Sequence, residues 1–281
     1  MTLPFEKWHG TGNDFILVSQ SVVDSYTGDT PGLARKACDR HFGIGSDGLI
    51  AIGRSDVARF RMRMWNPDGS ESEMCGNGLR CVGGHLAHNG IVDASESLPI
   101  ETGKGVITLD FPEPPDWADP HAYWLRADMG SPGFDDNRPV AEETLVIPGI
   151  ASPLKFTPVN MGNPHAVIFV ENLGLVAVET WGPIIENFTE RFPSRVNVEF
   201  AHVVSPDHVR MRVWERGAGL TLSCGSGTAA IQVAAHLTGK AGDKLRIDVP
   251  GGTLMTEYTE DGRVLLSGPA VRVFTGEWED E

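Results

Sequence analysis

Two short segments of the chain alternate arginine with apolar residues, FRMRMW at 60–65 and VRMRVW at 209–214. A repeat of two residues is typical of a β-strand with one buried face, so both segments are predicted to be strands. Each is followed by a turn rich in glycine and polar residues, and then by small and apolar residues at helical spacing, LRCVGGHLAH (79–88) and TAAIQVAAHL (228–237). The pattern therefore predicts the same strand, turn and helix twice.

The resemblance between these two regions extends to individual residues. Cys75 and Cys224 each begin a CGxG sequence and lie 149 residues apart. At the same offset, both arginines, one methionine and the tryptophan of the two strands match. Near the start of each half, GTGNDFILV (10–18) matches MGNPHAVIF (161–169) and aligns Asn13 with Asn163. Agreement of this density indicates an internal duplication that covers most of each half.

A chain of 281 residues is long enough for two domains of ordinary size. The segment FPEPPDWADP (111–120) is rich in proline and acidic residues and suits neither a helix nor a central strand. We expect the domains to be 1–124 and 125–268. The final stretch VLLSGPAVRVFTGEWE (264–279) is interpreted as a strand, a Gly-Pro break and a second strand, so that 269–281 returns to the first domain.

The amino-acid composition limits the binding partners that the protein can have. Lys and Arg number 23 against 38 Asp and Glu, and a net charge of −15 disfavours nucleic acid and anionic membranes. The amino terminus lacks the pattern of a secretory signal, and no apolar run approaches the length of a membrane span, so a cytoplasmic location is expected. The four cysteines are then reduced, and their spacing does not suit zinc, so we expect no metal site.

The two CGxG turns are the strongest candidates for chemistry. A thiol at a helix N-terminus experiences the positive end of the helix dipole, which lowers its pKa toward neutrality, and the N–H groups there suit a carboxylate. If Cys75 and Cys224 approach one carbon from opposite faces, one removes a proton and the other delivers one, as a racemase requires. The alternative is that both are buried structural residues. The duplicated context argues against it, whereas Cys38 and Cys81 have no repeat partner and are expected to be structural.

Polar residues near these turns suit an amino-acid ligand. Asn66 follows the first strand, and its repeat counterpart is Glu215, followed by Arg216. Arginine binds a carboxylate and glutamate an ammonium group, although Glu215 and Arg216 also fit a surface ion pair. His165 either tunes a thiol or is an ordinary loop histidine. The sequence GIGSDG (43–48) matches a dinucleotide motif, but it follows a predicted helix and precedes a predicted strand, the reverse of the required order.

The motifs WHGTGNDF, WNPDGSESEMCGNGLRC, MGNPH, RVNVEF and WERGAG with SCGSGT together resemble the diaminopimelate epimerases over nearly the whole chain. The resemblance implies an α/β (α+β) fold with two pseudo-symmetric domains, each a curled mixed β-sheet around a central helix, with the active site in the cleft between them. It also implies a homodimer, no cofactor, and conversion of the LL-isomer of diaminopimelate to the meso-isomer for lysine and peptidoglycan synthesis.

The same resemblance assigns roles to individual residues. Cys75 and Cys224 would exchange protons with the substrate, and His165 and Glu215 would tune them. The expected substrate contacts are Asn13, Asn66, Gly76, Asn77, Asn163, Asn197, Glu215, Arg216, Gly225 and Ser226.

The sequence departs from the family pattern at two positions. Gly48 stands where some members use a glutamine, and Leu220 replaces a common glutamate. Proline racemases also resemble this chain, but they have Gly-His after the first cysteine where it has Gly76 and Asn77. Two alternatives stay open: a racemase of another amino acid on the same scaffold, and a non-catalytic protein that binds an amino acid or senses redox state.

Overall fold

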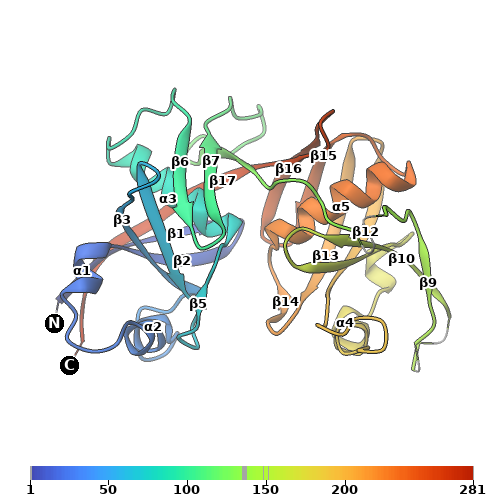
Figure 1. Cartoon of the computed structure of the whole chain (residues 1–281), viewed down its shortest axis with the longest axis horizontal. Coiled ribbons are helices and arrows are strands. Elements are labelled where there is room, and N and C mark those ends of the chain that lie inside the picture. The colour runs from blue at the N-terminus through green and yellow to red at the C-terminus, as the bar shows by residue number, and fades with distance from the viewer. Residues whose placement is uncertain (1, 135–137, 148, 151, 281) are drawn as a thin grey trace. The chain divides into compact units, whose positions relative to one another are not determined.

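The computed structural model describes residues 2–134, 138–147, 149, 150 and 152–280. The chain divides into two compact units, Met1–Ala127 with Gly268–Glu281, and Asp128–Ser267. Figure 1 colours the chain from blue to red, and shows the last strand, in red, among the blue and green strands of the first unit.

The first unit is a mixed sheet with three helices. Its elements are β1 (Thr2–Gly10), β2 (Asn13–Ser19), α1 (Gln20–Asp24), α2 (Thr30–Cys38), β3 (Gly48–Arg54), β4 (Phe60–Trp65), β5 (Glu71–Ser72), α3 (Gly76–His88), β6 (Leu98–Thr102), β7 (Gly105–Asp110), β8 (Tyr123–Asp128) and the end of β17 (Val264–Glu279). Strand β1 pairs antiparallel with β2, β2 parallel with β3, β3 antiparallel with β4, β4 parallel with β6, and β6 antiparallel with β7.

The second unit repeats this topology. Its elements are β9 (Glu143–Leu145), β10 (Leu154–Asn160), β11 (Pro164–Phe169), η2 (Leu173–Leu175), α4 (Val178–Glu186), β12 (Asn197–Ser205), β13 (His208–Glu215), β14 (Gly219–Thr221), α5 (Gly225–Thr238), β15 (Lys244–Val249) and β16 (Gly252–Tyr258). From β10 to β16 the pairings run in the same order and directions as those from β1 to β7. The predicted strands at 60–65 and 209–214 are confirmed as β4 and part of β13, and the predicted α/β (α+β) class is confirmed.

Both predicted helices begin where their cysteines were expected. Cys75 is the N-cap of α3 and Cys224 the N-cap of α5, each with extended backbone and each accepting a backbone N–H with its sulfur. Helix α5 ends at Gly239 in the left-handed conformation (φ 64°), which glycine adopts without strain. The strand, turn and helix unit therefore positions a thiol at a helix N-terminus twice.

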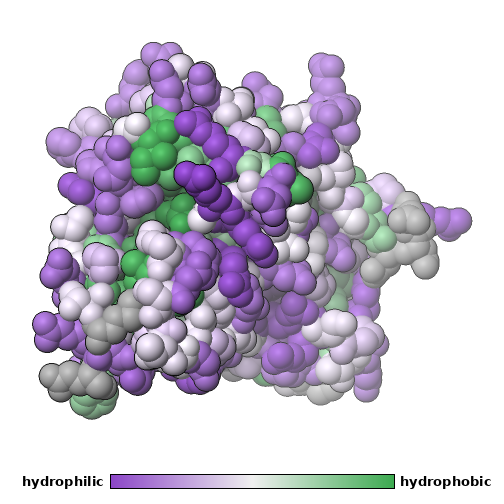
Figure 2. Space-filling model, turned by 60° about the vertical axis from the view of Figure 1, so that its left-hand side comes forward, coloured by the Kyte–Doolittle hydropathy of each residue, from purple (hydrophilic) through white to green (hydrophobic). Residues whose placement is uncertain are grey.

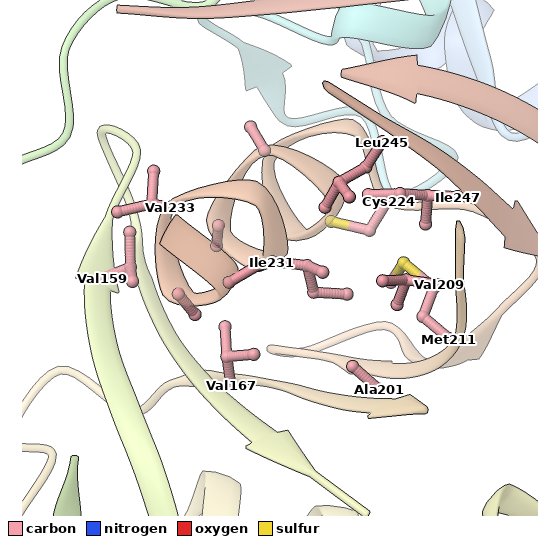
Figure 3. Close-up of a cluster of buried hydrophobic side chains, with 14 of the residues drawn as sticks. Val159, Val167, Ala201, Val209, Met211, Cys224, Ile231, Val233, Leu245 and Ile247 are labelled. Atoms are coloured by element: carbon pink, nitrogen blue, oxygen red, sulfur yellow. The ribbon is translucent and has the colours of Figure 1, made fainter. Parts of the chain in front are cut away.

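Apolar residues on both faces of the second sheet explain its stability. On one face Val159, Val167 and Ala201 pack against α5, in a buried cluster to which Cys224 belongs (Figure 3). On the other face a second cluster packs against α4, which covers Phe200 among others. Successive strand residues point to opposite faces, and each buried Val or Ile side chain contributes roughly 1.5–3 kcal/mol.

The first sheet is also covered on both faces. Helix α2 packs its Leu33 and Ala37 against Leu49. Helix α3 approaches strands closely because it carries small residues, and a Cβ added to Gly84 would lie 2.9 Å from the Trp8 ring. None of the helices in the described ranges is long and apolar enough to cross a membrane.

One expectation about the carboxyl end is wrong: no break occurs at Gly268 and Pro269. Strand β17 runs unbroken from Val264 to Glu279, pairing with β16 up to Ser267 and with β1 from Val271 onward. Proline tolerates extended backbone and only lacks an N–H group to donate. The Gly-Pro pair lies between these two ladders, so neither requires its N–H, and β17, which also pairs with β8, continues through it.

Two further local predictions, for residues 111–120 and for residues 43–48, are confirmed. Residues 111–120 form neither helix nor strand. The segment 43–48 follows α2 and leads into β3, so its glycines occupy a helix-to-strand connection. A dinucleotide motif needs the opposite order.

Candidate active site

The first half-site is built around the sulfur of Cys75. That sulfur accepts the N–H of Gly78 at 3.5 Å and donates to the side-chain oxygen of Asn13 at 3.7 Å. Asn13 begins β2 immediately after Gly12, whose φ of 82° suits a tight hairpin. The hairpin therefore presents the Asn13 amide to the thiol.

Charged groups behind Asn13 fix the direction of its amide. Its nitrogen donates to a carboxylate oxygen of Asp47 at 2.7 Å, and its oxygen accepts from the Asn77 nitrogen at 3.2 Å. A carboxylate only accepts hydrogen bonds, so the amide oxygen must face Cys75. Beneath this layer the fully buried Arg80 donates to the Asn77 oxygen at 2.6 Å. The first half-site thus contains a buried cation.

The second half-site has the same frame around Cys224. Its sulfur accepts the N–H of Gly227 at 3.3 Å and lies 3.5 Å from the hydroxyl of Ser226. The Glu215 carboxyl also hydrogen bonds to it, and in turn accepts from the hydroxyl of Thr221. Sequence analysis did not single out Thr221.

Carboxylates lie close to Cys224, and the pKa of this thiol is raised where the sequence predicted that it would be lowered. Burial raises the pKa of the Cys224 thiol well above its usual value, and the carboxylates of Glu215 and Glu199 raise it further, although Ser226 and the N–H of Gly227 act to lower it. Burial also raises the pKa of the Glu215 carboxyl. The predicted lowering toward neutrality is therefore wrong for Cys224, because desolvation of the thiolate outweighs the helix N-terminus.

His165 occupies the position that Phe15 holds in the first unit. It pairs with Asn197 across parallel strands as Phe15 pairs with Gly48. Its Nδ1 lies 2.7 Å from Glu199 Oε1 and its Nε2 lies 3.0 Å from Asn163 Oδ1. His165 thus lies on β11 and is hydrogen bonded to both Glu199 and Asn163.

Glu199 is a residue that sequence analysis missed. It is fully buried on β12, and a Cβ added to Gly227 would lie 2.6 Å from its Oε1. A charged residue in the otherwise apolar run VEFA (198–201) was the available signal. Its counterpart in the first unit is Ile50, whose Cδ1 would lie 2.8 Å from a Cβ added to Gly78.

Asn197 and Arg216 lie together at the end of β13. The Asn197 side chain donates to the carbonyl of Pro164 at 2.9 Å and accepts the backbone N–H of Arg216 at 3.0 Å. The Arg216 guanidinium donates to the Ser194 carbonyl at 2.9 Å. Glu215 bonds to Thr221 and Cys224, so these two neighbouring side chains hydrogen bond to different groups.

A second carboxylate that sequence analysis missed supports this turn. Glu186, the last residue of α4, is buried and accepts from the Trp214 indole at 2.8 Å, the N–H of Gly217 at 2.9 Å and the Arg195 guanidinium at 3.0 Å. Arg195 has a left-handed backbone (φ 58°), which is uncommon outside glycine. Glu186 therefore holds the Trp214 side chain before Arg216 and the Gly217 backbone after it.

The remaining predicted contacts lie at the ends of the same elements. Asn66 follows β4 and donates to the Ser70 hydroxyl at 3.0 Å. The buried residues Gly76 and Gly225 open α3 and α5. At Gly48 a Cβ would lie 2.8 Å from Met64, so the close packing explains the glycine, while Leu220 is exposed. Cys38 and Cys81 are buried, as expected of structural cysteines.

Each half-site thus combines a thiol, backbone N–H groups at a helix N-terminus and an asparagine amide. These groups bind anions and exchange protons. Within the described ranges, no group of three or more His, Cys, Asp or Glu side chains is arranged to hold a metal ion.

Comparison with solved structures identifies the class of fold. The chain matches a phenazine biosynthesis protein of the PhzF family from Bacillus anthracis with a TM-score of 0.73 and 18% identity, covering 99% of both chains. It matches a hydroxyproline epimerase from Agrobacterium vitis, solved with bound trans-4-hydroxy-L-proline, with a TM-score of 0.72 and 14% identity, covering 100% of this chain and 93% of that one. At these identities the likeness establishes the fold alone.

Sequence comparison identifies the family. The diaminopimelate epimerase family model matches residues 5–130 and 157–273. Relatives include the diaminopimelate epimerases of Moorella thermoacetica, 43% identical over 98% of both chains, and of Leptospira biflexa, 42% identical over 99% of this chain and 100% of that one. The chain belongs to the diaminopimelate epimerase family, and the predicted resemblance is confirmed.

Proposed function

We propose that this protein is an isomerase that converts LL-2,6-diaminopimelate to the meso-isomer, in the synthesis of lysine and of peptidoglycan precursors. The family membership supports the reaction and the substrate. The structural observation that carries the proposal is the repeated half-site, in which Cys75 and Cys224 each cap a helix beside an equivalent asparagine.

In this mechanism one cysteine, as thiolate, removes the Cα proton while the other, as thiol, delivers a proton to the opposite face of the same carbon. Their roles exchange in the reverse direction. N–H groups at the helix N-termini would stabilise the carbanion by hydrogen bonding to the α-carboxylate. Gly76 and Gly225, with Asn77 and Ser226, belong to these N-termini.

The other predicted residues bind the rest of the substrate. Asn13, Asn163, Asn66 and Asn197 provide amides, and Arg216 provides a guanidinium for a second carboxylate, which favours diaminopimelate over a monocarboxylic amino acid. Glu215 and His165 tune Cys224, to which Glu215 bonds directly. All the groups assigned to the mechanism belong to the chain, so no cofactor is required.

Proton NMR of the reduced protein with LL-diaminopimelate in heavy water tests the proposal. We expect loss of the Cα–H signal and formation of the meso-isomer, and loss of both in Cys75→Ser and Cys224→Ser. Cys38→Ser is the matched control, because Cys38 is a buried thiol on α2 that the mechanism does not use, and it should retain activity.

The other outcomes distinguish the alternatives. Exchange with another amino acid but not with diaminopimelate would indicate a different racemase that uses the same two cysteines. The absence of exchange with any amino acid would leave a binding or redox-sensing protein.

We propose that the protein is a cytoplasmic homodimer. Four cysteines in a chain of 281 residues are too few for a disulfide scaffold, which suits a reducing compartment. The first unit has a hollow of about 940 Å³ lined by β1, β2, β3, α1 and β17, and Val273 and Phe274 on β17 are about half exposed. Figure 2, which turns this unit forward, shows apolar side chains gathered in a hollow. A second copy would cover this surface, and light scattering should give twice the monomer mass of 30.4 kDa.

A further inference from the structure

The hydrogen bonds behind Cys224 form a continuous chain of side chains. Glu199 bonds to His165 (2.7 Å), His165 to Asn163 (3.0 Å), Asn163 to Ser226 (3.3 Å), and the Ser226 hydroxyl lies 3.5 Å from the Cys224 sulfur. All five residues belong to the second unit.

The direction of each bond follows from the orientation of the Asn163 amide. Its oxygen faces His165 Nε2 and its nitrogen donates to the Ser226 hydroxyl. His165 therefore lies between two acceptors, this amide oxygen and the Glu199 carboxylate. With Glu199 ionised, it donates to both only if each ring nitrogen carries a proton, that is, as an imidazolium.

Burial disfavours either charge alone, so an ionised Glu199 requires a charged His165 beside it. Both His165 and Glu199 have side chains with no exposed area, and Glu199 Oε2 has no hydrogen-bond partner among the described residues. A carboxylate in an apolar interior requires a compensating positive charge. The imidazolium of His165 is in contact with it, and the N-terminus of α5 beside Gly227 adds a favourable dipole.

The orientation of the Asn163 amide also decides the hydrogen bond between Ser226 and the Cys224 sulfur. Since Ser226 accepts from Asn163, its own hydrogen is free to point at Cys224 and to stabilise a thiolate. With a neutral His165 the amide would turn over, Ser226 would donate to the Asn163 oxygen, and the Ser226 oxygen would instead accept from a Cys224 thiol. No proton moves along the chain; the charge of His165 only sets the donor at each step.

We propose that Glu199 is a positioning residue that holds His165 as an imidazolium, and that the pair directs Asn163 and Ser226 so that Ser226 donates a hydrogen bond to Cys224. This inference rests on the proposed role of Cys224 as an acid and base. It explains how a thiol buried beside carboxylates becomes a thiolate when it serves as the base.

The first unit has no histidine and glutamate at the positions equivalent to His165 and Glu199. Its equivalents of His165 and Glu199 are Phe15 and Ile50, and the Asn13 amide is fixed in one direction by Asp47. Cys75 is therefore an internal control within the same molecule.

Other charged groups lie near the chain. They are Glu215 on β13, which bonds to Thr221 and Cys224, and Arg191 and Arg195, which line a cavity of about 250 Å³ with His165 and pair with Glu143 and Glu186. Glu215 is unchanged in every variant described below, so it does not affect the comparison of Cys224 alkylation rates between them.

Alkylation of the reduced, substrate-free protein by iodoacetamide over a range of pH, read at each cysteine by peptide mass spectrometry, tests the proposal. Thiolates react and thiols do not. In Glu199→Gln we expect Cys224 to react about tenfold more slowly near pH 7, the effect of one hydrogen bond to a charged sulfur. Cys75 should keep its wild-type profile.

Ser226→Ala provides a second test that leaves the buried ion pair intact. It should slow Cys224 by a similar factor, and adding Glu199→Gln to it should change the rate little further, because both substitutions interrupt one chain. If Glu199→Gln does not fold, as circular dichroism would reveal, Ser226→Ala still tests the last hydrogen bond of the chain, and an unchanged Cys224 profile in that variant would refute the proposal.

Three outcomes would overturn the proposal. They are an unchanged Cys224 profile, equal changes at Cys75 and Cys224, and faster reaction of Cys224 in Glu199→Gln, which would make Glu199 merely a repelling negative charge. Because alkylation needs no turnover, a wild-type protein that fails to epimerise any amino acid would contradict the proposed function while leaving this measurement valid.

Discussion

The buried carboxylate of Glu186 leads to a prediction that joins stability to binding. Replacing Glu186 with alanine removes the acceptor of the Trp214 indole, of the Gly217 amide and of the Arg195 guanidinium. A part-buried donor left without a partner costs roughly 1–3 kcal/mol. The Arg195 side chain is 49% exposed, so water replaces most of its bond. We therefore expect the free energy of unfolding of the second unit to fall by about 3 kcal/mol.

Hydrogen exchange is the suitable assay, because a chain of two units does not necessarily unfold in one step. The Gly217 amide should exchange faster in Glu186→Ala, and urea unfolding should occur at lower concentration. Since the turn after Arg216 loses a hydrogen bond at Gly217, KM for diaminopimelate should rise more than kcat falls. Glu186→Gln retains one acceptor oxygen and should lie between the wild type and alanine.

Glu190→Ala is the matched control, because Glu190 is an exposed glutamate near the same helix. It should change stability by less than about 0.5 kcal/mol. If Glu186→Ala matches this control in both exchange and unfolding, the argument that Glu186 holds the turn is refuted.

Three further predictions concern other parts of the chain. Gly227→Ala should destabilise the protein by about 2 kcal/mol in urea unfolding. The loss should exceed that in Gly78→Ala, because the new Cβ at 227 meets the carboxylate of Glu199 whereas the one at 78 meets the ends of flexible apolar side chains. Equal losses in the two variants would contradict this. Burial acts to raise the pKa of Asp14, but hydrogen bonds from an arginine and a lysine bring it below its usual value. Its ionised form therefore stabilises the fold above about pH 4. Asp14→Asn should lower the urea midpoint at neutral pH, and the difference from the wild-type midpoint should shrink as acid protonates Asp14. A difference in midpoint that does not depend on pH would count against the assignment. Burial raises the pKa of Cys81, so Cys81 should resist iodoacetamide in the native protein at mildly alkaline pH and react after unfolding, and native labelling by mass spectrometry checks this.

Much of the fold follows from local pattern. The alternation in β4 and β13, and the helical spacing after each CGxG sequence, predicted strands and helices that the structure confirms. The position of Cys75 and Cys224 at helix N-termini was predictable for the same reason, since a cap is defined by the residues immediately around it. The Gly-Pro pair in β17 was misinterpreted, because whether proline's missing N–H matters depends on which strand lies beside it.

The sequence by itself determined the duplication, the strand and helix units and the two thiols with their glycines, because these depend on residues close together in the chain. Only the tertiary structure decided the surroundings of each thiol. Asp47 and Arg80 lie behind Cys75, whereas Glu199 and His165 lie behind Cys224. The direction of the Cys224 pKa also depended on the tertiary structure, since desolvation is produced by the sheet, α5 and side chains distant in sequence. Two copies of one local motif thus acquire different electrostatics, because charge and burial act through space and not along the chain.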